Sequence, residues 1–195
     1  MDGERLSPEN ILQNVLTYLC FKAKTLSQSK LMKLVYLADV YHMERFGARL
    51  TNVPFKHWHY GPWSEEVDSE IERLCGMGII KQEPYLTRSG LKAEVPKPNV
   101  NQTTVNLSES ALEVLSDIIE DWGTASSDEV ITHAKTSLPF VGTPFGEQID
   151  FTRIDIVREF SKEKGISIKE AATTIVESDT ELMKSLARAK DKART

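Results

Sequence analysis

The stretch Lys30-Leu31-Met32-Lys33-Leu34-Val35-Tyr36-Leu37-Ala38-Asp39 carries the strongest structural signal in the chain, because its apolar residues recur on more than one face of a helix. One stripe comprises Leu31, Leu34, Val35, Ala38, Tyr41 and His42, and a second comprises Met32, Tyr36 and Met43. A helix with two apolar faces is largely buried. We therefore predict a central helix from about residue 27 to residue 46, ended by Gly47.

Helix signals also lie on both sides of this segment. Ser7-Pro8 is typical of a helix start, and apolar residues at helical spacing follow it, which predicts a helix over residues 8–22. Ser108 and the capping box formed by Ser126 and Glu129 predict the starts of two later helices.

The C-terminal part has a different character. A helix is predicted over residues 152–164 with a stop at Gly165, and Ser167 with Glu170 forms a second capping box that opens a further helix to about residue 187. Both helices are weakly apolar. The charged residues that follow are typical of a solvated tail.

Strand-like sequence lies between these helices. Residues 54–60 are aromatic and alternating, which predicts one strand with Phe55, His57 and His59 on a single face. Gly61-Pro62 is predicted to end this strand and to start a third helix over residues 63–75. Two β-prone pieces within residues 79–95 predict a small ribbon, and residues 96–106 a polar loop.

Residues 138–151 contain two prolines and two glycines together with Phe140 and Phe145, which predicts an ordered loop held by buried aromatic rings. The elements together predict a predominantly α-helical α+β fold. We expect a compact helical domain over residues 1–151, with a short aromatic strand and a small β-ribbon, and a helical C-terminal extension with a charged tail over residues 152–195.

Composition narrows the function classes. The 24 basic and 29 acidic residues give a net charge of −5, which disfavours binding to a nucleic-acid backbone. The chain has no apolar run long enough for a membrane helix, and its first residues lack a signal-peptide pattern, so a cytoplasmic protein is expected. Cys20 and Cys75 lie in no Cys-x-x-Cys pair and are expected to be reduced.

No phosphate loop, dinucleotide-binding turn, nucleophile elbow or zinc-protease helix occurs in the sequence. The best metal candidates are His57 and His59, with His42 or Cys75 as a third ligand, but histidines between aromatic residues are more often packed and hydrogen-bonded. Both cysteines fall at the C-terminal ends of predicted helices, where a thiolate is disfavoured. We expect neither an enzyme nor a cofactor.

A winged-helix DNA-binding protein has a similar outline of helices followed by a ribbon. Its recognition helix would be the third helix, whose exposed side offers Glu65, Glu66, Asp68, Glu70 and Glu72 against Arg73 alone. This face would repel phosphate groups.

Aromatic residues are dense between Trp58 and Trp63. Trp and Tyr are enriched in protein-binding hot spots, but they also seat strands against helices in small cores. The two interpretations stay open here, with packing in the core favoured for Trp58 and partner contact considered equally for Tyr60 and Trp63.

The helix motif of residues 30–39, followed by Phe55-Lys56-His57-Trp58-His59-Tyr60-Gly61-Pro62-Trp63-Ser64-Glu65-Glu66-Val67, resembles the Panacea-domain family of SocA-like, prophage-associated proteins. That family shows a Lys-Leu-x-Lys-Leu-x-Tyr helix, an interval with a glycine, and an aromatic-x-Tyr-Gly-Pro segment with a Glu-Val downstream. The resemblance extends more loosely to His133, Pro139 and Phe140. Trp63 departs from the small aliphatic residue of many relatives.

The resemblance implies an antitoxin that neutralises a toxin by direct protein binding, in one form as an adaptor that delivers the toxin to a ClpXP-type protease. The expected partner is therefore a cognate toxin protein, and the expected contact residues are Trp58, His59, Tyr60, Gly61, Pro62 and Trp63. The alternative is a phage-related transcriptional regulator that binds nucleic acid through the ribbon and the basic tail. A metal-dependent enzyme ranks third.

Overall fold

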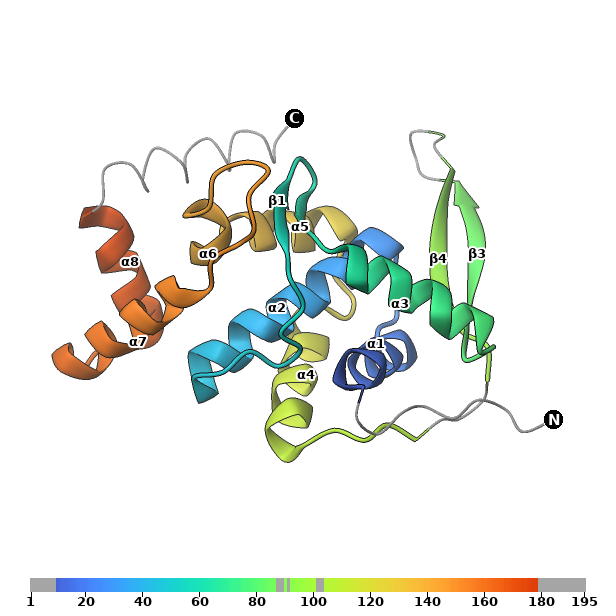
Figure 1. The fold of residues 1–195 in the computed structure, drawn as a ribbon, viewed down its shortest axis with the longest axis horizontal. Coiled ribbons are helices and arrows are strands. Elements are labelled where there is room, and N and C mark those ends of the chain that lie inside the picture. Colours follow the sequence, from blue (N-terminus) through green and yellow to red (C-terminus); the bar gives the residue numbers. More distant parts are fainter. Residues whose placement is uncertain (1–9, 87–89, 91, 101–103, 179–195) are drawn as a thin grey trace.

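The computed structural model describes residues 10–86, 90, 92–100 and 104–178. In this part of the chain it contains eight helices and two separate two-stranded antiparallel sheets, which confirms the predominantly α-helical α+β fold (Figure 1). The helices are α1 (Ile11–Lys22), α2 (Gln28–Phe46), α3 (Glu65–Gly76), α4 (Glu109–Trp122), α5 (Ser127–Lys135), α6 (Leu138–Val141), α7 (Thr152–Lys164) and α8 (Ile168–Ser178). The strands are β1 (Lys56–Trp58), β2 (Gly61–Trp63), β3 (Ile80–Leu86) and β4 (Lys92–Pro98).

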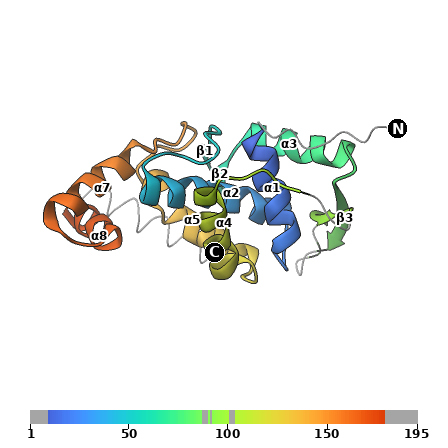
Figure 2. The same ribbon diagram turned by 90° about the horizontal axis from the view of Figure 1, so that it is seen from below.

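Helix α2 is the centre of the molecule, as its two apolar stripes predict. Every residue from Lys30 to Val40 is buried, and α1, α4, α5 and α7 pack against this helix. Figure 2 shows α7 and α8 at one end of α2 and the β3–β4 ribbon at the other. The helix begins after the N-cap Ser27, whose hydroxyl accepts a hydrogen bond from the Lys30 N–H, and it ends at Gly47 with a φ of 80°.

Three buried charged residues of α2 hold neighbouring segments in place. The Lys30 ammonium group donates hydrogen bonds to the carbonyl oxygens of Thr25 and Ala125, each at 2.7 Å. It thereby joins the turn before α2 to the turn between α4 and α5. Asp39 accepts hydrogen bonds from the backbone N–H of Thr51 at 2.6 Å and from the Arg49 guanidinium group at 2.6 Å, which fixes the segment that leads into β1. The third residue, Lys33, lies beneath the β1–β2 hairpin.

Several boundaries differ from the predictions. Helix α1 begins after Asn10, which caps it, and Ser7 and Pro8 lie outside the described residues. Strand β4 continues to Pro98 where a loop was predicted after residue 95. Each strand of a two-stranded ribbon has one unpaired edge, and a proline is tolerated where its nitrogen lies on that edge. The capping boxes at Ser126 and Ser167 are present. The predicted helix beyond residue 178 and the charged tail lie outside the described residues.

The largest correction concerns Gly61-Pro62, which does not end a strand ahead of a helix. Gly61, Pro62 and Trp63 form β2, which pairs with β1 so that Trp58 lies opposite Gly61 and Lys56 opposite Trp63. The tight turn between the two strands is possible because Gly61 takes a φ of 91°. Helix α3 consequently begins at Glu65 rather than at residue 63.

No helix among the described residues combines the length and the apolarity required to cross a membrane.

Candidate functional site

The β1–β2 hairpin displays its aromatic residues at an exposed tip. Trp58 is 44% exposed and Tyr60 75% exposed, and His59 between them is also exposed. The expectation that Trp58 packs in the core is therefore wrong. Phe55, which precedes the strand, takes that place: it is fully buried and meets the Tyr36 ring edge-on at 5.3 Å.

A fourth ring comes from the loop between α6 and α7. Phe145 is 52% exposed, so the prediction that it is buried is wrong, whereas Phe140 in α6 is buried as expected. The Phe145 ring is stacked on Trp58 at a centroid distance of 5.4 Å, and it lies 4.4 Å from the ring of His59. We call Trp58, His59, Tyr60 and Phe145 the hairpin patch. Sequence spacing gave no sign that Phe145 belongs to it, because the contact spans more than eighty positions in the chain.

Backbone hydrogen bonds attach this loop to β1. The N–H of Ile149 donates to the carbonyl of Phe55 at 2.7 Å, the N–H of His57 to Glu147 at 2.9 Å, and the N–H of Gly146 to His57 at 2.9 Å. The loop thus runs along β1 almost as a third strand. The positions of Trp58, His59 and Phe145 are therefore fixed by the backbone as well as by their ring contacts.

His57 is part of this connection. Its Nδ1 lies 2.7 Å from the carbonyl oxygen of Thr143, and its ring packs on Phe140 at 3.8 Å. His42, one of the two predicted third ligands, lies with its Nδ1 2.6 Å from the carbonyl oxygen of Ala48. Within the part of the chain that the structure describes, no three His, Cys, Asp or Glu side chains are grouped as a metal site would require.

The remaining predicted contact residues lie beneath the patch. Gly61 and Pro62 are buried, and Trp63 is half-buried with its indole N–H donating to Asp68 at 2.8 Å. The six predicted contact residues are therefore divided: Trp58, His59 and Tyr60 are available to a partner, and Gly61, Pro62 and Trp63 hold the hairpin against the helices.

Lys33 lies directly under this hairpin. Its Cε atom would be 3.3 Å from a Cβ atom at Gly61, so the backbone of the turn packs closely on the lysine side chain. Burial lowers the pKa of Lys33 to about 8; the Asp68 carboxylate opposes this shift and Lys135 adds to it. A buried ammonium group whose charged form is this strongly disfavoured is unusual in a small core. Lys33 is also the second lysine of the Lys-Leu-x-Lys-Leu-x-Tyr motif that carries the family resemblance.

The cysteines offer no activated thiol. Cys20 is buried in α1, and burial raises its pKa to about 12; the pKa of Cys75 is also raised, mainly by burial. Neither is a thiolate at neutral pH.

The family model described as "Antitoxin SocA-like, Panacea domain" matches residues 31–137, which is more than half of the chain. The chain belongs to this antitoxin family. The match begins in α2 and ends just after α5, so the Panacea domain includes the hairpin, α3 and the ribbon, while Phe145, α7 and α8 follow it. No curated protein and no solved structure matches the chain.

Proposed function

We propose that this Panacea-domain protein neutralises a toxin by binding it directly through the hairpin patch, in the cytoplasm and without catalysis. Membership of an antitoxin family supports the general role. The observation that carries the choice of surface is the group of exposed rings formed by Trp58, His59, Tyr60 and Phe145. Large aromatic side chains dominate the binding energy of protein interfaces. Trp58, His59 and Phe145 lose little conformational freedom on binding because their rings already contact one another.

The experiment is co-expression with the product of the adjacent gene, followed by titration calorimetry of the purified pair. Tyr60→Ala and Phe145→Ala should each weaken binding by about 2 kcal/mol or more, as expected of hot-spot residues, and should leave the melting temperature nearly unchanged. Tyr85→Ala is the matched control, because Tyr85 is a tyrosine on the β3–β4 ribbon that is 53% exposed.

Equal affinities for wild type and both patch variants would refute the hairpin patch as the interface. If both variants lose stability and affinity in parallel, the two rings stabilise the folded protein and do not contact the toxin.

The nucleic-acid alternative has little support in the ribbon. Lys81 and Lys97 both form ion pairs with Glu83, which offsets part of their positive charge. Adaptor delivery to a ClpXP-type protease stays a prediction of the family resemblance. It is tested by measuring whether the protein accelerates degradation of the bound toxin by the purified protease.

A further inference from the structure

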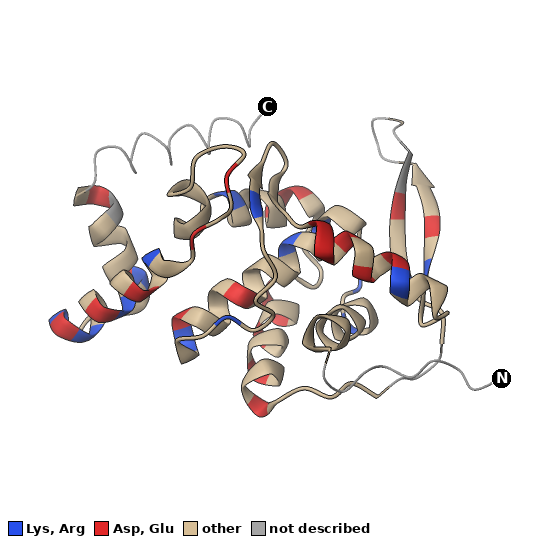
Figure 3. Ribbon diagram, in the orientation of Figure 1, with Lys and Arg blue, Asp and Glu red and all other residues tan. Residues whose placement is uncertain are grey.

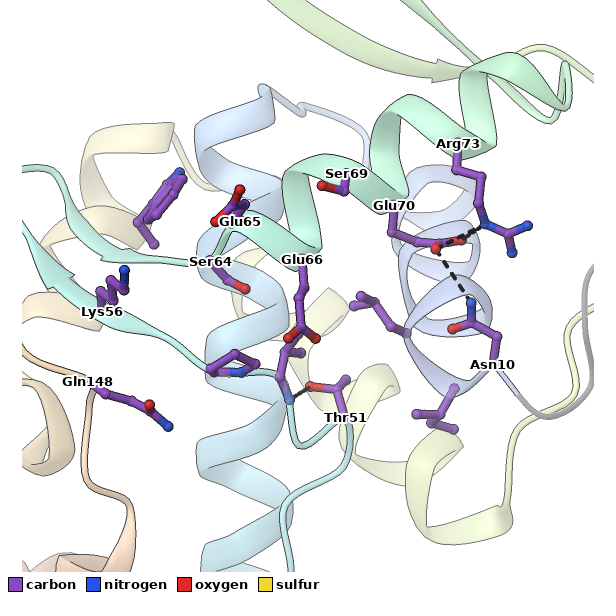
Figure 4. Close-up of a pocket in the computed structure, with 15 residues that line it drawn as sticks. Asn10, Thr51, Lys56, Ser64, Glu65, Glu66, Ser69, Glu70, Arg73 and Gln148 are labelled. Carbon is purple, nitrogen blue, oxygen red and sulfur yellow. Dashed lines mark hydrogen bonds and ion pairs between the residues drawn. The ribbon is translucent and has the colours of Figure 1, made fainter.

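A groove of about 910 Å³ lies beside the hairpin, between α3, the start of α1 and the segment that leads into β1 (Figure 4). Apolar side chains from α1 and from the segment before β1 form part of its lining: Ile11, Leu12, Val53 and Pro54. Lys56 of β1 and Trp63 of β2 also line it, so the groove adjoins the hairpin that carries the patch. Its length follows α3 as far as Arg73.

The α3 wall of the groove is acidic. Glu65, Glu66 and Glu70 line it, and Figure 3 shows the acidic residues gathered along α3. Glu70 is already bound by Arg73 at 3.1 Å and by the side chain of Asn10 at 3.4 Å. Glu65 and Glu66 are exposed and form no ion pair within the described part of the chain. Lys56, at the hairpin end of the groove, likewise has no ion-pair partner among the described residues.

The first turn of α3 also has an unused hydroxyl group. Ser64 is 1% exposed, and its Oγ atom has no hydrogen-bond partner among the described residues. It occupies the N-cap position, where a serine hydroxyl normally accepts a hydrogen bond from the first turn, yet it makes no such bond here. Figure 4 shows its oxygen on the side of the groove where the Glu66 carboxylate lies. A buried hydroxyl without a partner is costly unless a ligand supplies one.

We propose that this groove binds an extended, basic segment of the partner protein, with its Lys or Arg side chains on Glu65 and Glu66 and a backbone carbonyl oxygen on the Ser64 hydroxyl. The proposal rests on the proposed function, because it supplies the second contact surface for the same partner. The groove offers hydrogen-bond donors and unpaired carboxylates, and a basic polypeptide complements both. Its carbonyl groups accept hydrogen bonds from Ser64 and from the N–H groups of the first turn of α3, and its cationic side chains pair with the carboxylates. Apolar parts of the same segment cover the floor.

Other occupants fit the groove less well. A nucleic acid would meet the two unpaired carboxylates of α3. A free anion would use the α3 N-terminus and Lys56 but would lie beside the same carboxylates. A second copy of this chain carries a net charge of −5, and Arg45, Arg49 and Arg73 are already paired with carboxylates of their own chain.

The test uses the full chain labelled with ¹⁵N and two peptides, Ala-Lys-Ala-Arg-Ala-Lys and its acidic counterpart Ala-Glu-Ala-Asp-Ala-Glu. The basic peptide should produce saturable amide shifts at Thr51, Ser64 and Glu66, and the affinity should fall as salt is added. Glu66→Lys should weaken binding by about tenfold or more. Glu72→Lys is the matched control, because it makes the same charge reversal on an exposed site of α3 outside the groove. Ser64→Ala should weaken binding by a few fold without lowering the melting temperature.

The absence of saturable shifts with the basic peptide overturns the proposal. Shifts of equal size at the acidic residues Glu113, Asp117 and Asp121 of α4 also overturn it. So do preferential binding of the acidic peptide, equal losses in Glu66→Lys and Glu72→Lys, or shifts that depend on protein concentration and report a second copy. Binding of the basic peptide by a protein that fails to bind the toxin would instead refute the proposed function and leave the groove intact. Toxin binding that is lost in Tyr60→Ala but kept in Glu66→Lys would overturn the groove and leave the hairpin patch.

Discussion

Lys30 and Lys33 provide an unusually direct test of how this core treats buried charge, because the same substitution should have opposite effects one turn apart on α2. The Lys30 ammonium group donates to the carbonyl oxygens of Thr25 and Ala125 at 2.7 Å and of Gly123 at 3.3 Å. Lys30→Met keeps most of the apolar volume but removes these donors. Ala125 and Gly123 keep other donors from Thr25, whereas no other donor to the Thr25 carbonyl is seen among the described residues.

The expected cost of Lys30→Met combines two contributions. Hydrogen bonds from a charged donor contribute about 1.5 to 3 kcal/mol, and a carbonyl left without a partner costs about 1 to 3 kcal/mol. The desolvated charge that methionine eliminates offsets part of this, since burial lowers the pKa of Lys30. We expect Lys30→Met to lower the free energy of unfolding by about 3 kcal/mol.

Lys33→Met should have the reverse sign at neutral pH. The folded protein holds the Lys33 proton less tightly than the unfolded chain does, because its pKa falls from 10.5 to about 8. The resulting cost is fully present below pH 8 and disappears as the pH rises toward 10.5. Methionine removes that cost, so stability at pH 7 should rise by up to about 3 kcal/mol, and the gain should shrink at higher pH. Asp68 retains the Gln28 and Trp63 donors in this variant.

Urea unfolding followed by circular dichroism measures both variants, with the denaturant slope checked for constancy so that midpoints can be compared. Equal destabilisation by the two substitutions would refute the reasoning, because it would show that both lysines merely fill space. A gain in Lys33→Met that does not change with pH would show that removing the charge is not its cause.

Three further predictions concern the core, the C-terminal helices and a second titrating group. Leu34→Ala on the central helix should cost about 2 to 5 kcal/mol in calorimetric melts, because Leu34 is fully buried, and an unchanged melting temperature would contradict this. A chain that ends at Lys164 should still unfold cooperatively, because α8 packs on α7 whereas Ile154 of α7 belongs to the buried core. Increased binding of a hydrophobic dye by the shortened chain would contradict this prediction. Burial raises the pKa of Glu44 from 4.5 to about 7, so the folded state carries a cost that develops above pH 4.5 and is complete above pH 7. Glu44→Gln should therefore stabilise the protein by up to about 3 kcal/mol at pH 8 and have no effect at pH 4, which pH-dependent melts can verify.

The sequence predicts those parts of the fold whose signals are local. The two apolar stripes of α2, the N-caps at Ser27 and Ser108, and the capping boxes at Ser126 and Ser167 all act within a few residues, and each appears where expected. The hairpin was missed because proline fits both a first helical position and a strand edge. Only the tertiary setting, in which Gly61 packs on Lys33 with a positive φ, selects the second.

The candidate site is predictable to a similar extent and for a similar reason. Aromatic density points to the region around Trp58, but which rings face solvent depends on what covers the hairpin. Phe55 occupies the core position, so β1 presents Trp58 outward, and the loop that pairs with β1 brings Phe145 to it. Neither the core contacts of Phe55 nor the contact between Phe145 and Trp58 can be predicted from the spacing of residues along the sequence.

In the proposed function one short motif serves both folding and binding, because the buried face of the hairpin sets the orientation of its exposed face. Gly61 and Pro62 are buried against the helices, and Trp63 is fixed by Asp68, so the direction of the turn is set from below. The orientation of the turn determines the direction in which the exposed side chains of Trp58 and Tyr60 point. A partner that docks on them meets rings whose arrangement already exists in the free protein, so little of the binding energy is spent on ordering them. In the proposed function, Gly61 and Pro62 therefore contribute to affinity without touching the partner.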